Sequence, residues 1–178
     1  MHRIIRFFSY ISVSLPLLLL YTGTSAAQPV ARNVVSDGLR SVPVYDFNGL
    51  APLLSSQSDT TFVVNFWATW CAPCVEELPY FEDLTKTTSG KPVKVLLVSL
   101  DFRKQLKTRL LPFLKKNDIQ STVLVIDDAD ANTWIDKVDP SWSGAIPATL
   151  VFRRDRREFR EQSFTRDELF QLVQSFTE

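Results

Sequence analysis

A run of β-branched and aromatic residues from Thr61 to Trp67 ends just before the two cysteines of the chain. Almost no polar residue interrupts it, which is typical of a central strand that is covered on both faces. After Cys71, apolar residues recur at helical spacing to about Thr87, with acidic residues between them, and this pattern predicts an amphipathic helix. The sequence therefore places Cys71 where a buried strand gives way to a helix.

The rest of the chain alternates between strand and helix patterns. Strands are expected at 42–47, 93–100, 122–126, 148–152 and 158–162, and helices at 48–54, 103–116, 129–138 and from Thr165 onward. Such alternation predicts an α/β fold. With 178 residues, of which 45% are hydrophobic, the chain suits one well-buried domain preceded by a leader.

The first 27 residues have the pattern of a secretory signal. Arg3 and Arg6 precede an apolar stretch, and small residues then fit a cleavage site between Ala27 and Gln28. We therefore expect an exported, periplasmic protein. The alternative is an uncleaved membrane anchor, although the apolar stretch is interrupted by polar residues and is shorter than the roughly 20 residues that a span needs.

Behind the leader, residues 28–40 are polar and aperiodic, which predicts a flexible tether, and residues 41–178 are expected to form the domain. The 20 basic side chains of the whole chain equal its 20 acidic ones. The protein therefore has no net electrostatic attraction for nucleic acid, and we do not expect nucleic acid to be a partner.

Both cysteines of the chain lie in Cys71-Ala72-Pro73-Cys74. A disulfide that closes only two intervening residues removes little entropy from the unfolded chain, so redox chemistry explains the pair better than structural stabilisation does. At a helix start, free backbone N–H groups and the helix dipole favour a thiolate, which makes Cys71 the expected nucleophile. Cys74, one turn later, can resolve the mixed disulfide, and Pro73 stiffens the turn between the sulfurs.

Two other uses of the pair are weighed against redox exchange. A purely structural disulfide remains open in an oxidising compartment. A zinc or Cu(I) site is disfavoured because the chain has no further cysteine and its one histidine, His2, lies in the leader. We expect neither a metal nor a cofactor.

Residues 64–74, with the sequence Val-Asn-Phe-Trp-Ala-Thr-Trp-Cys-Ala-Pro-Cys, are followed by Glu77-Leu78-Pro79. This segment resembles the active site of thioredoxin-fold proteins and is most similar to their exported TlpA/ResA-like branch. Residues 144–152 resemble the family segment in which a cis-proline precedes a strand and lies against the active-site disulfide. The resemblance extends over about residues 41–178. It implies a thioredoxin-like fold, with a central mixed sheet flanked by helices and an extra β-α element between the two motifs.

The resemblance also implies roles for residues around the cysteines. Pro147 would be cis, and Ile146 would supply backbone groups that pair with an extended substrate segment. Trp70 would flank the reactive sulfur, and together with Pro73 it would contact the substrate.

Two polar residues near the cysteines carry a separate expectation. Asn65 stands where cytosolic thioredoxin has a buried aspartate, so this chain lacks that proton acceptor. Glu77 matches a glutamate of the TlpA/ResA-like branch and is the candidate for tuning cysteine ionisation. The alternative for Glu77 is a solvated helix face, as its neighbour Glu76 illustrates.

The implied activity is that of an enzyme, a thiol-disulfide oxidoreductase working through Cys71 and Cys74. We expect a monomeric reductase with two kinds of protein partner, a disulfide-containing client and an electron-donor thiol protein, in the membrane or outside it. An oxidase or isomerase using the same cysteines is the alternative, and a non-enzymatic metal-handling or docking module on the same fold ranks below it. A peroxidase of the superfamily is disfavoured because its nucleophilic cysteine lies in a different local motif.

Overall fold

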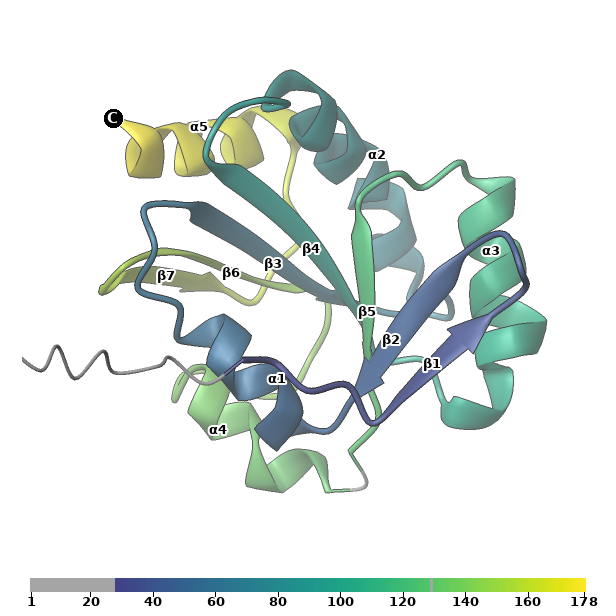
Figure 1. The fold of residues 1–178 in the computed structure, drawn as a ribbon. Helices are drawn as coiled ribbons and strands as arrows, with labels where there is room; N and C mark the ends of the chain where they lie inside the picture. Colours follow the sequence, from purple (N-terminus) through teal and green to yellow (C-terminus); the bar gives the residue numbers. More distant parts are fainter. Residues whose placement is uncertain (1–27, 129) are drawn as a thin grey trace, which may run out of the picture.

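The computed structural model describes residues 28–128 and 130–178, so the predicted signal in residues 1–27 lies outside the described residues. The described chain forms a seven-stranded sheet with helices on both faces (Figure 1). Its strands are β1 (Asn33–Ser36), β2 (Ser41–Tyr45), β3 (Thr61–Trp67), β4 (Val93–Ser99), β5 (Thr122–Ile126), β6 (Ala148–Arg153) and β7 (Arg156–Arg160). Its α-helices are α1 (Phe47–Leu54), α2 (Ala72–Thr87), α3 (Leu111–Lys116), α4 (Ile135–Val138) and α5 (Arg166–Thr177).

The sheet is mixed and has the order β1-β2-β5-β4-β3-β6-β7. Strands β2, β5, β4 and β3 run parallel to one another, whereas β1, β6 and β7 pair antiparallel with their neighbours. The prediction of an α/β fold with a central mixed sheet flanked by helices is confirmed.

Two apolar layers cover the sheet. Helices α2, α3 and α5 pack on one face and α1 and α4 on the other (Figure 1). Every residue of β3 is buried, because alternate side chains enter the two layers. Val63 and Trp67 lie in the α2 layer and Phe62 and Phe66 in the opposite layer, so Asn65 shares the face of the sheet that α2 covers.

The strand register brings three distant segments to one edge of the sheet. Trp67 at the end of β3 lies beside Ser99 at the end of the parallel strand β4, and Phe66 lies opposite Ala148, the first residue of the antiparallel strand β6. The residues that follow β3 and β4 and those that precede β6 therefore meet. They include both cysteines and the Ile146–Pro147 segment.

The tether expected over residues 28–40 is wrong for its central part. Residues 33–36 form β1, which pairs with β2 so that Val35 lies opposite Val42 and enters the core. A tight turn joins the two strands: Gly38 has a φ of 88°, and the Asp37 carboxylate accepts hydrogen bonds from the amides of Leu39 and Arg40. The sequence signal for this hairpin is the Asp37-Gly38 turn, which follows Val34 and Val35.

Two predicted helices are less regular than expected. The segment 103–116 comprises a 3₁₀ turn (Arg103–Gln105), a π-helical turn (Leu106–Leu110) and α3, since Pro112 has no N–H to continue a regular ladder. Of the helix expected at 129–138, the described residues 130–138 comprise a 3₁₀ turn (Ala131–Thr133) and the short helix α4, and residue 129 lies outside the described residues. Within residues 28–128 and 130–178, no helix combines the length and the apolar character that a membrane span requires.

Candidate active site

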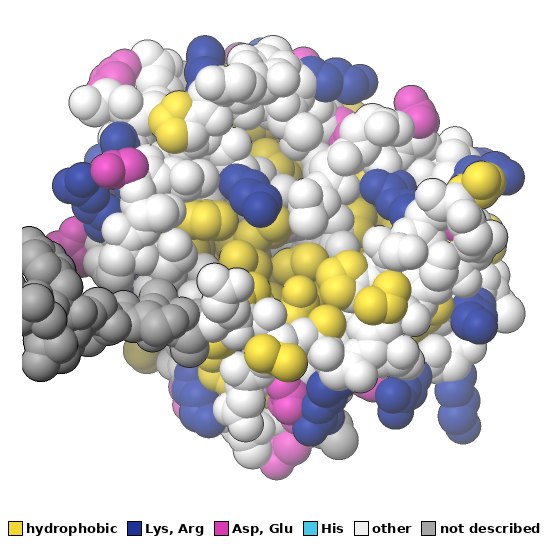
Figure 2. Space-filling model, viewed as in Figure 1, with side chains coloured by type: hydrophobic (Ala, Val, Ile, Leu, Met, Phe, Trp, Pro, Cys, Tyr) yellow, Lys and Arg dark blue, Asp and Glu magenta, His cyan; other side chains and the backbone are white. Residues whose placement is uncertain are grey.

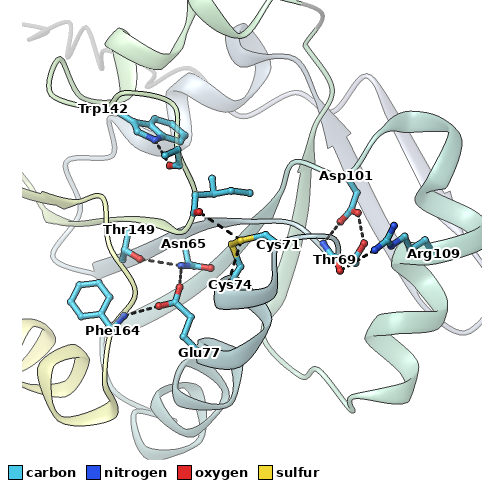
Figure 3. The surroundings of a disulfide bond; sticks show 12 residues. Asn65, Thr69, Cys71, Cys74, Glu77, Asp101, Arg109, Trp142, Thr149 and Phe164 are labelled. Atoms are coloured by element: carbon cyan, nitrogen blue, oxygen red, sulfur yellow. Dashed lines mark hydrogen bonds between the residues drawn. A yellow bond between two sulfur atoms is a disulfide. The ribbon is translucent and has the colours of Figure 1, made fainter.

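Cys71 and Cys74 form a disulfide at the amino-terminal end of α2 (Figure 3). Cys71 caps the helix: its backbone is extended, and its Sγ accepts a hydrogen bond from the Cys74 amide at 3.3 Å. Cys71 is 7% exposed, whereas Cys74 is completely buried. Of the two cysteines, therefore, only Cys71 keeps any contact with solvent.

The segment before β6 faces the disulfide. The peptide bond between Ile146 and Pro147 is cis, and the Ile146 carbonyl oxygen lies 3.7 Å from the Cys71 Sγ. In the disulfide form this sulfur carries no proton, so the approach is a contact. In the dithiol form the Cys71 thiol has an acceptor in reach.

Residues outside this segment hold it in place. The Trp142 indole donates a hydrogen bond to the Ala145 carbonyl at 2.8 Å. The Glu161 carboxylate, which follows β7, accepts hydrogen bonds from the amides of Ser143 and Ala145 at 2.9 and 3.1 Å and from the Ser143 hydroxyl. These bonds, the Ser143 hydroxyl first, hold the pKa of Glu161 below its usual value. The loop that presents Ile146 is thus anchored through the residues just before it, 142–145.

Glu77 lies one helical turn after Cys74 and is 1% exposed, so the alternative of a solvated helix face is wrong. Its Oε1 accepts a hydrogen bond from the Asn65 amide at 2.9 Å, and its Oε2 accepts one from the Phe164 backbone at 2.8 Å. Asn65 also donates to the Thr149 hydroxyl at 3.1 Å. The network joins β3, α2, β6 and the start of the α5 segment beneath the disulfide (Figure 3).

Burial determines the acidity of Glu77. Removal from water raises its pKa from 4.5 to about 7, although the hydrogen bonds from Phe164 and Asn65 favour the carboxylate and oppose the rise. No basic side chain is among these partners. Near neutral pH, Glu77 therefore populates both its protonated and its ionised form.

A second polar cluster lies on the other side of the disulfide (Figure 3). The buried Asp101 carboxylate accepts hydrogen bonds from the Thr69 amide at 3.1 Å, from the Thr69 hydroxyl, and from Ser99 at 2.8 Å. Arg109 donates to the Thr69 carbonyl at 3.4 Å. Asp101 thus fixes the loop that leads to Cys71. Asp101 is not among the residues predicted from the sequence, although an aspartate directly after the strand expected at 93–100 was the signal.

The remaining predicted residues surround the exposed side of Cys71. Trp70 is 45% exposed, and Pro73 is exposed in the first turn of α2. Pro147 is buried. The structure thus brings together all seven residues predicted for the site: Cys71, Cys74, Glu77, Trp70, Pro73, Ile146 and Pro147. Among the described residues, no group of three His, Cys, Asp or Glu side chains is placed to hold a metal ion.

Comparison with known proteins places this geometry in a family. A model described as the AhpC/TSA family matches residues 46–157, more than half of the chain. The thiol-disulfide oxidoreductase ResA of Oceanobacillus iheyensis is 46% identical over 48 residues, which are 27% of this chain and 25% of that protein. ResA of Bacillus cereus is 26% identical over 113 residues, 63% of this chain and 60% of that protein. The chain thus covers a quarter and three-fifths of these two relatives.

A solved structure supports the same fold. The thiol:disulfide interchange protein of the thioredoxin family from Chlorobium tepidum superposes with a TM-score of 0.58 over 86% of this chain and 100% of that one, at 19% identity. This likeness, together with the relatives, confirms the predicted thioredoxin-like fold and the predicted resemblance.

Proposed function

This chain belongs to the AhpC/TSA family of thioredoxin-like proteins, and we propose that it is an exported thiol-disulfide oxidoreductase that reduces disulfides of partner proteins. One observation carries the proposal: two bonded cysteines at a helix start differ in access, with Cys71 7% exposed and Cys74 completely buried behind it. A nucleophile and a resolving group require this difference.

The reaction begins with the dithiol form. The Cys74 amide and the positive end of the α2 dipole stabilise a Cys71 thiolate. The thiolate attacks one sulfur of the partner disulfide, a mixed disulfide forms, and the other partner sulfur leaves as a thiolate. Cys74 then attacks the Cys71 sulfur and releases the second partner sulfur. Two electrons pass to the partner, and the Cys71–Cys74 bond remains.

Glu77 handles the proton of the resolving step in this proposal. Cys74 must lose its thiol proton before it attacks, and it is buried among apolar side chains. Glu77 lies one turn further along the same helix and has a pKa of about 7. A group with this pKa accepts and returns protons readily at neutral pH.

The partner segment binds across the exposed side of Cys71. The Ile146 backbone faces the reacting sulfur and offers hydrogen bonds to an extended chain, while Trp70, Pro73 and Pro147 shape the surface around it. The protein then needs a thiol donor to regenerate the dithiol, so it has two kinds of protein partner, and it acts as a monomer. The sequence of residues 1–27 supports export.

The direction of electron flow is tested by the reduction potential of the pair. The full chain is equilibrated with glutathione and with dithiothreitol buffers, and its free thiols are trapped. A value near or below about −250 mV supports the reductase. A value near about −120 mV would instead make the protein an oxidant and reverse the proposed direction.

The roles of the two cysteines are tested by trapping. The Cys74→Ser variant is expected to accumulate mixed disulfides with clients on non-reducing gels, because the resolving sulfur is missing. The Cys71→Ser variant is the matched control and should trap nothing. Equal trapping by both variants would contradict the assigned order of attack.

A further inference from the structure

Two exposed aromatic rings stack directly beside the reactive cysteine. Trp70 is 45% exposed and Phe102 is 65% exposed; their ring centroids are 6.2 Å apart, with 18° between the ring planes. The other large hydrophobic side chains exposed in the described chain, Val30, Val34 and Leu39, lie in its amino-terminal segment. The aromatic pair, Trp70 and Phe102, is thus an apolar surface adjoining Cys71.

The two rings come from two different loops. Trp70 follows Thr69, and Phe102 follows Asp101. The Asp101 carboxylate accepts hydrogen bonds from both the amide and the hydroxyl of Thr69. The buried carboxylate therefore holds the two loops together at the point where the rings emerge. Exposed rings that are fixed in this way gain contact area on binding with little loss of conformational entropy.

A basic segment, residues 103–109, continues from the pair. It contains Arg103, Lys104, Lys107 and Arg109, all of them exposed, and it has no acidic residue. Arg103 pairs with Asp127, and Arg109 donates to Thr69. Among the described residues, Lys104 and Lys107 form no ion pair. On the face drawn in Figure 2, basic and acidic side chains lie around a centre of apolar ones.

We propose that the aromatic pair and the basic segment form a docking subsite for client proteins, which takes a large apolar side chain flanked by Asp or Glu next to the client disulfide. The proposal deepens the proposed function and rests on it. The apolar side chain packs on the two rings, which lie next to the sulfur that every client must reach. The acidic neighbours lie against Lys104 and Lys107, so the charges are complementary.

The test compares rate constants of the reduced full chain with designed substrates. Two synthetic peptides carry the same disulfide and the same phenylalanine, flanked either by glutamates or by lysines, and 2-hydroxyethyl disulfide is the small neutral reference. For Phe102→Ala, the ratio of the glutamate-peptide rate to the reference rate is expected to fall about five- to tenfold. The Lys104→Glu/Lys107→Glu variant should lose about tenfold at low salt and prefer the lysine peptide, and salt should weaken this effect.

Matched controls lie far from the cysteines. Leu39→Ala removes another exposed apolar side chain, and Lys91→Glu reverses another exposed charge; both should keep the wild-type ratio. If Phe102→Ala slows all three substrates equally, or leaves the ratio unchanged, the docking subsite is refuted. Concentration-dependent dimerisation that disappears in Phe102→Ala would assign the aromatic pair to a second copy of the chain and would also refute it.

Failure of the proposed function would look different. The wild type would then exchange with none of the three substrates, including 2-hydroxyethyl disulfide. In that case, the glutamate peptide with serines in place of its cysteines is titrated into the oxidised protein and followed by tryptophan fluorescence. Binding that weakens in Phe102→Ala would uphold the docking subsite alone, and no binding would refute it.

Discussion

Replacing Glu77 with glutamine removes an ionisable proton from a buried side chain while keeping its size. Burial raises the pKa of Glu77 from 4.5 to about 7 in the folded protein, so the folded state holds the proton more tightly than the unfolded chain does. Ionising the carboxyl therefore costs folding free energy. Since one pKa unit corresponds to about 1.4 kcal/mol, the full cost is about 3 kcal/mol.

The sign of the pH dependence follows from proton binding. Between the two pKa values, the folded protein binds the Glu77 proton and the unfolded chain has lost it, so stability falls as the pH rises. The free energy of unfolding of the wild type therefore falls progressively from about pH 4.5 to about pH 7 and stays at its lower value above pH 7. Glu77→Gln avoids this loss. Relative to the wild type, the variant should gain about 3 kcal/mol between about pH 4 and about pH 8.

Urea denaturation of the oxidised full chain across this pH range measures the difference, and the disulfide keeps the two cysteines from titrating. Glu76→Gln is the matched control, because Glu76 is the preceding residue of the same helix and is exposed. Its free energy of unfolding should differ from the wild type by a constant amount. A Glu77→Gln difference that is equally constant with pH would refute the assignment of a raised pKa.

Three further changes test the elements around the disulfide. Asp101→Asn should lower the free energy of unfolding by roughly 2 kcal/mol in urea denaturation, because an amide cannot accept both hydrogen bonds of Thr69; an unchanged midpoint would count against this. Trp142→Phe removes the hydrogen bond to the Ala145 carbonyl and should lower the free energy of unfolding by about 1 kcal/mol in the same assay. The Trp142→Tyr variant also lacks the indole N–H, so an unchanged free energy of unfolding in that variant would show that the bond contributes nothing. For Glu161→Gln, the melting temperature should lie below that of the wild type at neutral pH and approach it as the pH falls, because hydrogen bonds lower the Glu161 pKa and their stabilisation is lost in acid; a gap that persists in acid would contradict this.

The sequence predicted the parts of the molecule that local patterns determine. The strand before the cysteines, the amphipathic helix α2 and the positions of Cys71 and Cys74 follow from residues close together in the chain. The same holds for the start of the last helix, expected at Thr165, where the structure has a capping box of Thr165 and Glu168. The resemblance then supplied the distant Ile146–Pro147 segment.

The environment of each polar group could not be predicted in this way. The burial of Glu77 depends on Asn65, Thr149 and Phe164, which lie on other elements and up to 87 residues away. Asp101 reaches Thr69 only because β3 and β4 pair in one particular parallel register. The contacts of Asp101 and Glu77 join segments that are distant in the sequence, so they form only when the sheet is assembled and are not visible in the pattern of any one segment.

The composition of the Glu77 network indicates what maintains it. A buried acid with a raised pKa destabilises the fold at neutral pH, and the Asn65 Oδ1 is buried without a hydrogen-bond partner among the described residues. An unsatisfied polar atom of this kind costs about 1–3 kcal/mol, whereas apolar residues of similar volume at positions 65 and 77 would avoid both costs. Stability therefore does not account for these two side chains. The proposed role of Glu77 as the proton acceptor for Cys74, with Asn65 and the Phe164 amide orienting its carboxylate, does account for them.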